Sequence, residues 1–200
     1  MFISIEGIDG SGKSSVSEYV ISRLRENGQK VILFREPGAT ILGERVRDIL
    51  LNSEFSVSPV SELLLYFASR AQLIEDKISP ALEKGEIVLC DRFIDSSIAY
   101  QGAGLDIGME KVQDLFELFW PGLYPDLTIL LDSDPGKALR RINAYDRIEK
   151  RGLEYFQRVR EGFLSLAERF DDRIVLVDAD VNLDELKEEV WNRISSFLRL

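Results

Sequence analysis

Residues 7–14 read Gly-Ile-Asp-Gly-Ser-Gly-Lys-Ser and match the pattern G-x-x-x-x-G-K-[ST] in full. In this pattern the glycines let backbone N–H groups turn toward phosphate, the lysine contacts the β- and γ-phosphates, and the final hydroxyl can reach a Mg²⁺ ion. The spacing therefore predicts a phosphate-binding loop. Its members are Gly7, Ile8, Asp9, Gly10, Ser11, Gly12, Lys13 and Ser14.

The elements on either side of this loop are those that the motif requires. An apolar run at residues 2–5 precedes it, and Val16, Val20 and Leu24 follow at the spacing of one helical face. The phosphates would lie at a helix N-terminus, where unpaired N–H groups and the helix dipole favour negative charge. A glycine-rich turn without a ligand is the alternative, but four fixed positions and both flanking elements argue against it.

Asp91 and Arg92 form a second candidate group, directly after the apolar run at residues 87–90. A carboxylate that ends a hydrophobic strand can hold Mg²⁺ through water, and an adjacent guanidinium can bridge two phosphates. We therefore expect Asp91 to act with Ser14 at the metal and Arg92 to contact the transferring phosphoryl group. The alternative is a structural Asp-Arg pair that caps the strand.

Residues 143–152 are charged and lack an apolar period, which predicts a lid. Arg147 and Arg151 lie in this segment, and either could fold over a transferring phosphoryl group. A solvated, salt-bridged helix end is the competing interpretation.

Tyr66 and Arg70 are four residues apart in a helical pattern that covers residues 59–84, so they project from the same face. An aromatic ring beside a guanidinium can stack on a base and donate a hydrogen bond to its carbonyl oxygen. From spacing alone, the interpretation of Tyr66 as a core residue is favoured.

The organisation of the chain is a regular alternation of strand and helix patterns. Apolar runs of strand length lie at residues 2–5, 31–34, 87–90, 127–131 and 174–177. This alternation predicts one α/β domain over residues 1–200, with a parallel sheet of about five strands covered by helices on both faces. Charged residues follow the runs at Glu6, Arg35, Asp91, Asp132 and Asp178. Because ligands of open α/β sheets bind beyond the carboxyl ends of the strands, we expect these charges to converge there.

Composition excludes several classes of function. The chain has 200 residues, one cysteine, no histidine and a formal net charge of −10. Without histidine, a Ser/His/Asp triad is excluded and a zinc centre is disfavoured, and the acidic balance argues against nucleic acid as a partner. No apolar run approaches the roughly 20 residues of a membrane helix, and no signal-peptide pattern precedes the first strand, so we expect no membrane partner and a cytoplasmic location.

These residues suit phosphoryl transfer to a phosphate acceptor. A nucleoside monophosphate is already largely dianionic near pH 7, so it needs no strong base, and catalysis consists of bringing two anions together with Mg²⁺, lysine and arginine. The absence of histidine is compatible with this chemistry. A slow nucleotide-dependent switch is the alternative from another class, but the chain lacks the guanine-binding pattern Asn-Lys-x-Asp.

Four further segments carry a resemblance over nearly the whole chain. Residues 35–40 (Arg-Glu-Pro-Gly-Ala-Thr) are close to R-E-P-G-G-T, and residues 66–72 are close to F-A-A-x-R-A-Q. Residues 91–102 are close to D-R-Y-x-x-S-x-x-A-Y-Q-G, and residues 125–132 to P-D-L-T-x-x-L-D. With these segments, the sequence resembles the thymidylate kinases of the bacterial subtype, within the P-loop nucleoside monophosphate kinases.

The resemblance implies a three-layer α/β/α fold of the P-loop NTPase type. It also implies transfer of the γ-phosphoryl of ATP to dTMP, giving dTDP and ADP, with Mg²⁺, in dTTP biosynthesis, by a homodimer. A kinase of the same fold that acts on another nucleotide or a deoxynucleoside is the alternative.

The resemblance further implies residue roles. Lys13, Arg92, Asp9 and the lid residue Arg147 would be catalytic, and Arg141 would contact ATP. Arg47 would bind the acceptor phosphate, Arg70 would read the thymine carbonyl, and Tyr100 would disfavour a 2′-hydroxyl. The implied acceptor site comprises Glu36, Arg47, Tyr66, Phe67, Ser69, Arg70, Arg92, Ser96, Ser97, Tyr100 and Gln101.

The chain departs from the family pattern at three positions. Ala39 stands where the family has glycine, which could alter a backbone position with positive φ. Phe93 replaces a tyrosine, and Tyr66 replaces a phenylalanine with Phe67 beside it. Whether Tyr66 or Phe67 stacks on the base stays open, as does the choice of catalytic lid arginine.

Overall fold

A computed structural model describes residues 1–142 and 146–200 of the chain. A sheet of five strands runs through it in the order β2-β3-β1-β4-β5, and every neighbouring pair is parallel. The strands are β1 (Phe2–Gly7), β2 (Val31–Arg35), β3 (Ile87–Asp91), β4 (Leu127–Asp132) and β5 (Ile174–Asp178). The predicted α/β fold with a five-stranded parallel sheet is confirmed, and each predicted strand begins at the expected residue.

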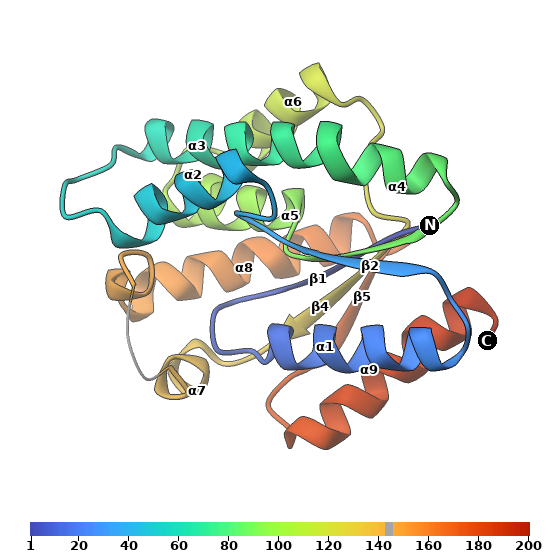
Figure 1. The fold of residues 1–200 in the computed structure, drawn as a ribbon. Helices are drawn as coiled ribbons and strands as arrows, with labels where there is room; N and C mark the ends of the chain where they lie inside the picture. Colours follow the sequence, from blue (N-terminus) through green and yellow to red (C-terminus); the bar gives the residue numbers. More distant parts are fainter. Residues whose placement is uncertain (143–145) are drawn as a thin grey trace.

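Helices cover both faces of the sheet (Figure 1). On one face lie α1 (Lys13–Glu26) and α9 (Leu183–Leu198), and on the other lie α3 (Pro59–Leu73), α5 (Ile94–Ser97) and α8 (Leu153–Arg169). The core is accordingly divided into two clusters, one on each side of the sheet. All residues of β1 and β3 are buried, as expected for central strands of a parallel sheet that helices cover on both faces.

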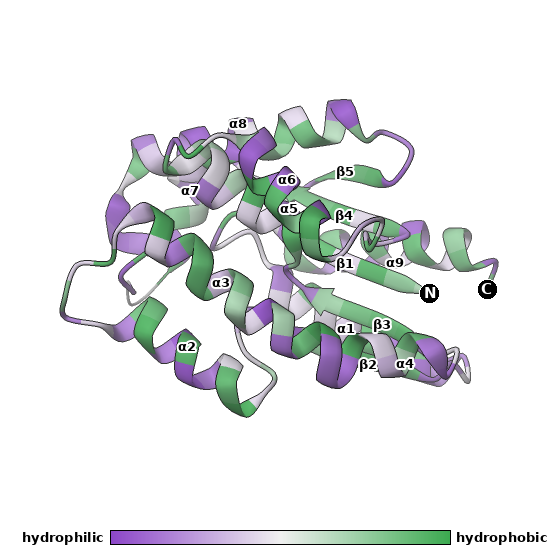
Figure 2. Ribbon diagram, turned by 90° about the horizontal axis from the view of Figure 1, so that it is seen from above, coloured by the Kyte–Doolittle hydropathy of each residue, from purple (hydrophilic) through white to green (hydrophobic). Residues whose placement is uncertain are grey.

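Polar and apolar residues alternate along the other helices of the chain (Figure 2). These are α2 (Ile41–Asn52), α4 (Ser79–Glu83), α6 (Met109–Phe119) and α7 (Pro135–Arg140). Helix α2 was not predicted from the sequence; the Thr40 side chain caps it by accepting a hydrogen bond from the Gly43 N–H. No helix within the two described ranges has the length and apolar character needed to cross a bilayer.

Two π-helical turns shape the segments that carry candidate site residues. The turn η1 (Ile74–Ile78) joins α3 to α4, so the helix predicted over residues 59–84 continues through a change of register. The turn η2 (Ile98–Gly104) follows α5 and carries Tyr100 and Gln101. It packs tightly on α8, since a Cβ on Gly104 would lie 2.7 Å from the Tyr155 ring.

The predicted lid is only partly within the described chain. Residues 143–145 lie outside the described residues, and the remainder contains the short 3₁₀ helix η3 (Glu149–Arg151). Asp146 caps this turn, because its Oδ1 accepts hydrogen bonds from the N–H groups of Ile148 and Glu149 at 2.7 and 2.8 Å. Residues 146–151 are called the η3 segment below.

Candidate active site

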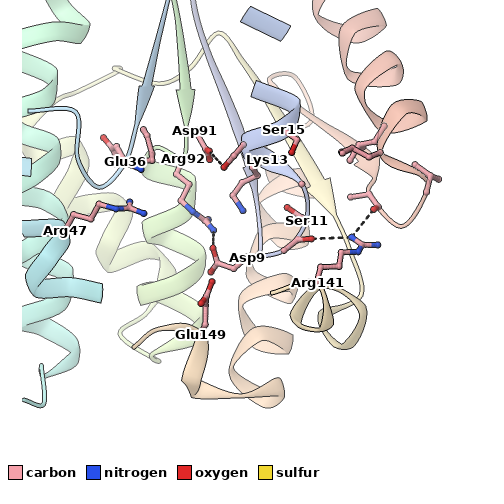
Figure 3. A pocket seen from close by; sticks show the side chains of 18 residues that line it. Asp9, Ser11, Lys13, Ser15, Glu36, Arg47, Asp91, Arg92, Arg141 and Glu149 are labelled. Atoms are coloured by element: carbon pink, nitrogen blue, oxygen red, sulfur yellow. Dashed lines mark hydrogen bonds and ion pairs between the residues drawn. The ribbon is translucent and has the colours of Figure 1, made fainter. Parts of the chain in front are cut away.

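The predicted phosphate loop lines a cavity of about 500 Å³ at the carboxyl edge of the sheet (Figure 3). Gly10 and Gly12 have φ values of 81° and 96°, and a Cβ on Gly10 would lie 2.1 Å from the carbonyl oxygen of Ala138. Glycine is therefore required at position 10 for both conformation and space. Helix α1 starts at Lys13 with no side-chain cap, so its first N–H groups are left for a ligand.

Lys13 is almost fully buried at the centre of this cavity, with 7% of its surface exposed. Its Nζ donates a hydrogen bond to the carbonyl oxygen of Ile8 at 2.8 Å. Burial, together with the positive charge of Arg92, lowers the pKa of Lys13 to about 8. Binding of an anion beside the Lys13 ammonium is therefore favourable.

Ser14 and Asp91 meet at the side of the cavity because β1 and β3 are neighbours in the sheet. The Ser14 hydroxyl donates to Asp91 Oδ2 at 3.0 Å. In the part of the chain that the structure describes, no group of three or more His, Cys, Asp or Glu residues could hold a metal by itself. The two oxygens suit a Mg²⁺ ion whose other ligands are phosphate oxygens and water.

Arg92 lies where the cavity meets a second, narrower pocket of about 70 Å³. Its φ of 75° is in the left-handed region, and this conformation directs the side chain back over the phosphate loop. The guanidinium donates to the Gly7 carbonyl (2.9 Å), Ser96 Oγ (3.0 Å), Asp9 Oδ1 (2.5 Å) and the Tyr100 hydroxyl (3.0 Å). Four partners therefore fix one planar cation at the junction of the pockets.

Glu6, at the end of β1, stabilises the turn that carries Arg92. This fully buried carboxyl group accepts hydrogen bonds from the Phe93 N–H at 2.7 Å and from the Ser96 hydroxyl at 2.5 Å. Burial, reinforced by the negative charge of Asp95, raises the pKa of Glu6 to about 8. Glu6 thus stabilises the turn that follows Arg92 through hydrogen bonds to Phe93 and Ser96, and it lines neither pocket.

Asp9 and Tyr100 complete the junction. The Tyr100 hydroxyl donates to Asp9 Oδ2 at 2.8 Å and accepts from the Asp9 N–H at 3.1 Å. Burial opposes ionisation of Asp9, but the charges of Arg92 and Lys13 outweigh it and hold the pKa of Asp9 below its ordinary value. Asp9 lines both pockets as a carboxylate.

The second pocket contains most of the residues expected to bind an acceptor. Arg70 lies at its inner wall with 1% of its surface exposed, and its guanidinium pairs with Glu36 Oε2 at 2.6 Å. Further Arg70 donors reach Ser97 Oγ (3.0 Å) and the Phe93 carbonyl (3.1 Å). The other Glu36 oxygen, Oε1, is buried and has no hydrogen-bond partner among the described residues. From the expected acceptor set, this pocket is lined by Glu36, Arg47, Tyr66, Arg70, Arg92, Ser96, Ser97, Tyr100 and Gln101.

The structure distinguishes the two adjacent rings. Tyr66 lines the second pocket, whereas Phe67 is 6% exposed and packs against Phe116 and Trp120 at centroid distances of 6.5 and 6.3 Å. Ser69 also lies outside the pocket lining, where its hydroxyl accepts a hydrogen bond from the Gly38 N–H at 3.2 Å. Phe67 and Ser69 therefore do not line the second pocket and can affect a ligand there only through the residues that do.

Several other predicted residues lie away from the pocket walls. Gly7 and Ile8, at the start of the phosphate loop, do not line either pocket, and their carbonyl groups accept hydrogen bonds from Arg92 and Lys13. The Arg147 guanidinium pairs with Glu62 at 2.5 Å and does not line either pocket. Its catalytic role stays a prediction, and the structure does not bring it to Lys13 and Arg92. Asp132 is likewise absent from the lining, since Arg160 pairs with it at 2.6 Å.

Arg141 lies at the far end of the first cavity, as expected for a donor contact (Figure 3). It donates to the Gly10 and Ala179 carbonyls at 3.3 and 3.4 Å. Apolar residues that the sequence analysis missed complete this end of the cavity; they are Ala179, Val181, Leu183 and Leu186. Their position just after the last strand, at the carboxyl edge of the sheet, is the signal that could have identified them.

Comparison with known proteins decides the family. A family model described as thymidylate kinase matches residues 5–190. The chain belongs to the thymidylate kinase family. It is 42% identical over 199 residues to the thymidylate kinase of Thermoanaerobacter sp. (strain X514), covering 98% of both chains. It is 44% identical over 198 residues to that of Deinococcus radiodurans, covering 98% of this chain and 96% of the relative.

A solved thymidylate kinase has the same fold. The crystal structure of thymidylate kinase from Ehrlichia chaffeensis superposes with a TM-score of 0.81 at 35% identity, over 98% of both chains. The predicted family is thus confirmed, and with it the class of phosphotransferases that use a phosphate group as acceptor.

Two departures from the thymidylate kinase pattern can now be located. Ala39 has a φ of 63°, so the chain keeps a left-handed conformation where the family pattern has glycine. Phe93 is fully buried and packs edge-on against Phe2 at 4.8 Å and Phe116 at 5.7 Å. Phe93 therefore contributes to the hydrophobic core and lines neither pocket.

Proposed function

We propose that the chain transfers the γ-phosphoryl group of Mg·ATP to dTMP, giving dTDP and ADP. The observation that carries this proposal is the position of Arg92. Its guanidinium lines both pockets and is held by four partners, so one cation faces the ends of two adjoining anion sites. Such an arrangement suits a reaction in which two phosphate chains meet end to end.

In the proposed donor site, the phosphates of ATP lie on the loop N–H groups and the N-terminus of α1. Arg141 and the apolar residues Ala179, Val181 and Leu183 would flank the adenine end. Ser14 and Asp91 would hold Mg²⁺, which when bound neutralises charge on the phosphates.

In the proposed acceptor site, Arg47 binds the phosphate of dTMP. Its Nη1 already donates to the Pro37 carbonyl at 3.0 Å, and burial together with the charge of Arg35 lowers its pKa, so an anion beside it is favoured. Tyr66 would stack on the thymine ring, and Arg70 would donate to its carbonyl. Tyr100 would lie at the sugar, where its hydroxyl is tied to Asp9.

Transfer itself would rest on positioning and charge. Lys13 would contact the β- and γ-phosphates as an ammonium, and Arg92 would stabilise the charge on the phosphoryl group as it moves between oxygens. The acceptor phosphate is already ionised, so the chain needs no proton-accepting side chain.

We also propose a cytoplasmic homodimer. Exposed apolar side chains on α3 and α6 are consistent with a subunit contact, since Leu64, Leu118 and Phe119 are 52%, 73% and 60% exposed. On α6, Val112 and Phe116 face the core instead, so only part of the apolar stretch that begins at residue 112 is free for a contact.

The proposed reaction is tested by steady-state rates with Mg·ATP and a panel of acceptors. The panel comprises dTMP, dUMP, dCMP, dAMP, dGMP, UMP and thymidine, and phosphorylated products are separated by chromatography. We expect the highest kcat/KM with dTMP. Absence of dTDP formation would reject the proposal, and a higher kcat/KM with another acceptor would establish the alternative kinase.

A further inference from the structure

Glu62, in the first turn of α3, is a buried carboxylate with no exposed surface. It accepts hydrogen bonds from Arg147 Nη2 at 2.5 Å, from Arg151 Nη1 and Nη2 at 3.0 and 2.6 Å, and from Gln101 Nε2 at 3.1 Å. One carboxylate thus joins three parts of the chain: α3, the π-helical turn η2 and the η3 segment.

The charges in this cluster depend on Glu62. Burial opposes ionisation of Glu62, but the hydrogen bonds and charge of Arg151 and the hydrogen bonds of Arg147 and Gln101 outweigh it, so the pKa of Glu62 lies below its ordinary value. The two guanidiniums are only 18% and 19% exposed and share this one counter-ion. Removing its charge would leave two poorly solvated cations next to each other, which is strongly unfavourable.

The same contacts hold the η3 segment against the body of the protein. The Arg147 N–H donates to the Leu51 carbonyl at 3.1 Å, and its Nε donates to the Leu50 carbonyl at 2.7 Å. Arg151 also donates to the Tyr155 hydroxyl at 2.9 Å. Arg147 and Arg151 therefore attach the η3 segment through ion pairs that both end on Glu62, beside the apolar packing of the buried Ile148.

The η3 segment forms part of the wall of both pockets. Asp146 and Ile148 line the second pocket, as does Gln101, the third partner of Glu62. Glu149 lines the first cavity, with its carboxylate directed toward Asp9 (Figure 3). The side chain of Glu62 lines neither pocket, so any effect it has on a ligand must pass through its partners.

We propose that Glu62 is a positioning residue for the phosphoryl transfer, because it fixes Arg147, Arg151 and Gln101 and thereby sets the wall of both pockets. The inference rests on the proposed function only in the choice of dTMP as the acceptor probe. Asp146, Ile148 and Gln101 line the second pocket, whereas Glu149 lines the first. Loss of Glu62 should therefore weaken acceptor binding more than donor binding.

The first test needs no ligand. Glu62→Gln keeps the volume of the side chain and removes its charge, and hydrogen exchange is measured for the amides of residues 146–151 in the full chain. We expect exchange at least about tenfold faster than in the wild type, with no change in β1, because loss of one partner of a buried ion pair releases the other. Arg151→Met tests the same contact from the other side if Glu62→Gln folds poorly.

The matched control is Arg160→Met on α8, which removes the two-bond ion pair with Asp132, at 2.6 and 2.8 Å, outside both pockets. It should leave exchange in the η3 segment unchanged. Unchanged exchange in Glu62→Gln, or equal acceleration in Arg160→Met, would overturn the proposal.

The second test separates positioning from general destabilisation. Titration calorimetry gives the Kd of dTMP and of a non-hydrolysable ATP analogue for each variant. For Glu62→Gln we expect dTMP to bind about tenfold more weakly and the analogue within about threefold of the wild type. Faster exchange with unchanged dTMP affinity would also overturn the proposal. A wild-type protein that fails to bind dTMP would instead reject the proposed function, and the exchange experiment would still decide the position of the η3 segment.

Discussion

Arg92 and Asp9 form an ion pair of 2.5 Å between Nη2 and Oδ1, which joins the end of β3 to the phosphate loop. The pair lies at the junction of the two pockets, and Tyr100 contacts both partners. An approaching phosphate would therefore meet a guanidinium whose direction is already set. Such preorganisation favours stabilisation of the charge that develops during phosphoryl transfer.

Replacing Lys13 with Met should lower kcat by about 10³-fold, since the variant lacks the buried cation that contacts the donor phosphates. The fold should be retained, because the methionine removes a desolvated charge and keeps a similar length. Coupled ADP-release kinetics and circular dichroism measure the two quantities. Lys30→Met, at an exposed position, is the matched control and should stay within twofold of the wild type. Near-normal turnover in Lys13→Met would remove Lys13 from its proposed role.

The buried carboxyl group of Glu6 should make stability fall as pH rises. Its pKa is raised from 4.5 to about 8 in the folded protein, so between these values the folded state binds more protons than the unfolded state. The stabilisation that protonated Glu6 contributes is therefore fully present below about pH 4.5. It decreases as the pH rises from 4.5 and is lost once the pH has risen through about 8. Urea unfolding from pH 5 to 9 should show this decline in the wild type and a smaller one in Glu6→Gln. Parallel pH profiles for the two proteins would contradict the assignment.

Truncation of Tyr66 should affect acceptor binding, whereas truncation of Phe67 should affect stability. Tyr66→Ala should raise the KM for dTMP about tenfold with little loss of stability, because base stacking contributes about 1–3 kcal/mol. Phe67→Ala should lower the free energy of unfolding by about 3–5 kcal/mol, because it opens a cavity beside Phe116 and Trp120. Kinetics and urea unfolding on both variants check the pair. If Phe67→Ala raised the KM for dTMP and Tyr66→Ala did not, the assignment of Tyr66 as the ring that stacks on the base would be wrong.

Ala39→Gly should stabilise the protein. Ala39 adopts a φ of 63°, a conformation that costs an L-residue roughly 1–2 kcal/mol, while glycine loses about 0.5–1 kcal/mol of extra backbone entropy on folding. The expected net gain is about 0–1.5 kcal/mol in urea unfolding. Ala71→Gly, within helix α3, serves as the control and should lose about 1 kcal/mol. A destabilised Ala39→Gly would show that the left-handed conformation carries no such strain.

The sequence alone determined those features whose residues are contiguous or share one helical face. The phosphate loop is eight consecutive residues, and its backbone requirements are local, so its position before α1 follows directly from its glycines. The five strands follow from apolar runs long enough to be buried on both faces. Tyr66 and Arg70 line one pocket together because their four-residue spacing places them on one side of α3.

Only the tertiary structure decided contacts that depend on strand order and helix packing. Ser14 meets Asp91 across 77 positions because β3 lies beside β1, and no local pattern encodes that neighbour. Phe67 is a core residue because α6 packs over it, so two adjacent aromatic residues receive different environments. Glu62 is distant in sequence from Arg147 and Arg151, so the sequence does not show whether its carboxylate pairs with them or is exposed to solvent. Local sequence specifies backbone conformation and one-sided burial, whereas long-range pairing is fixed by the packing of the whole core.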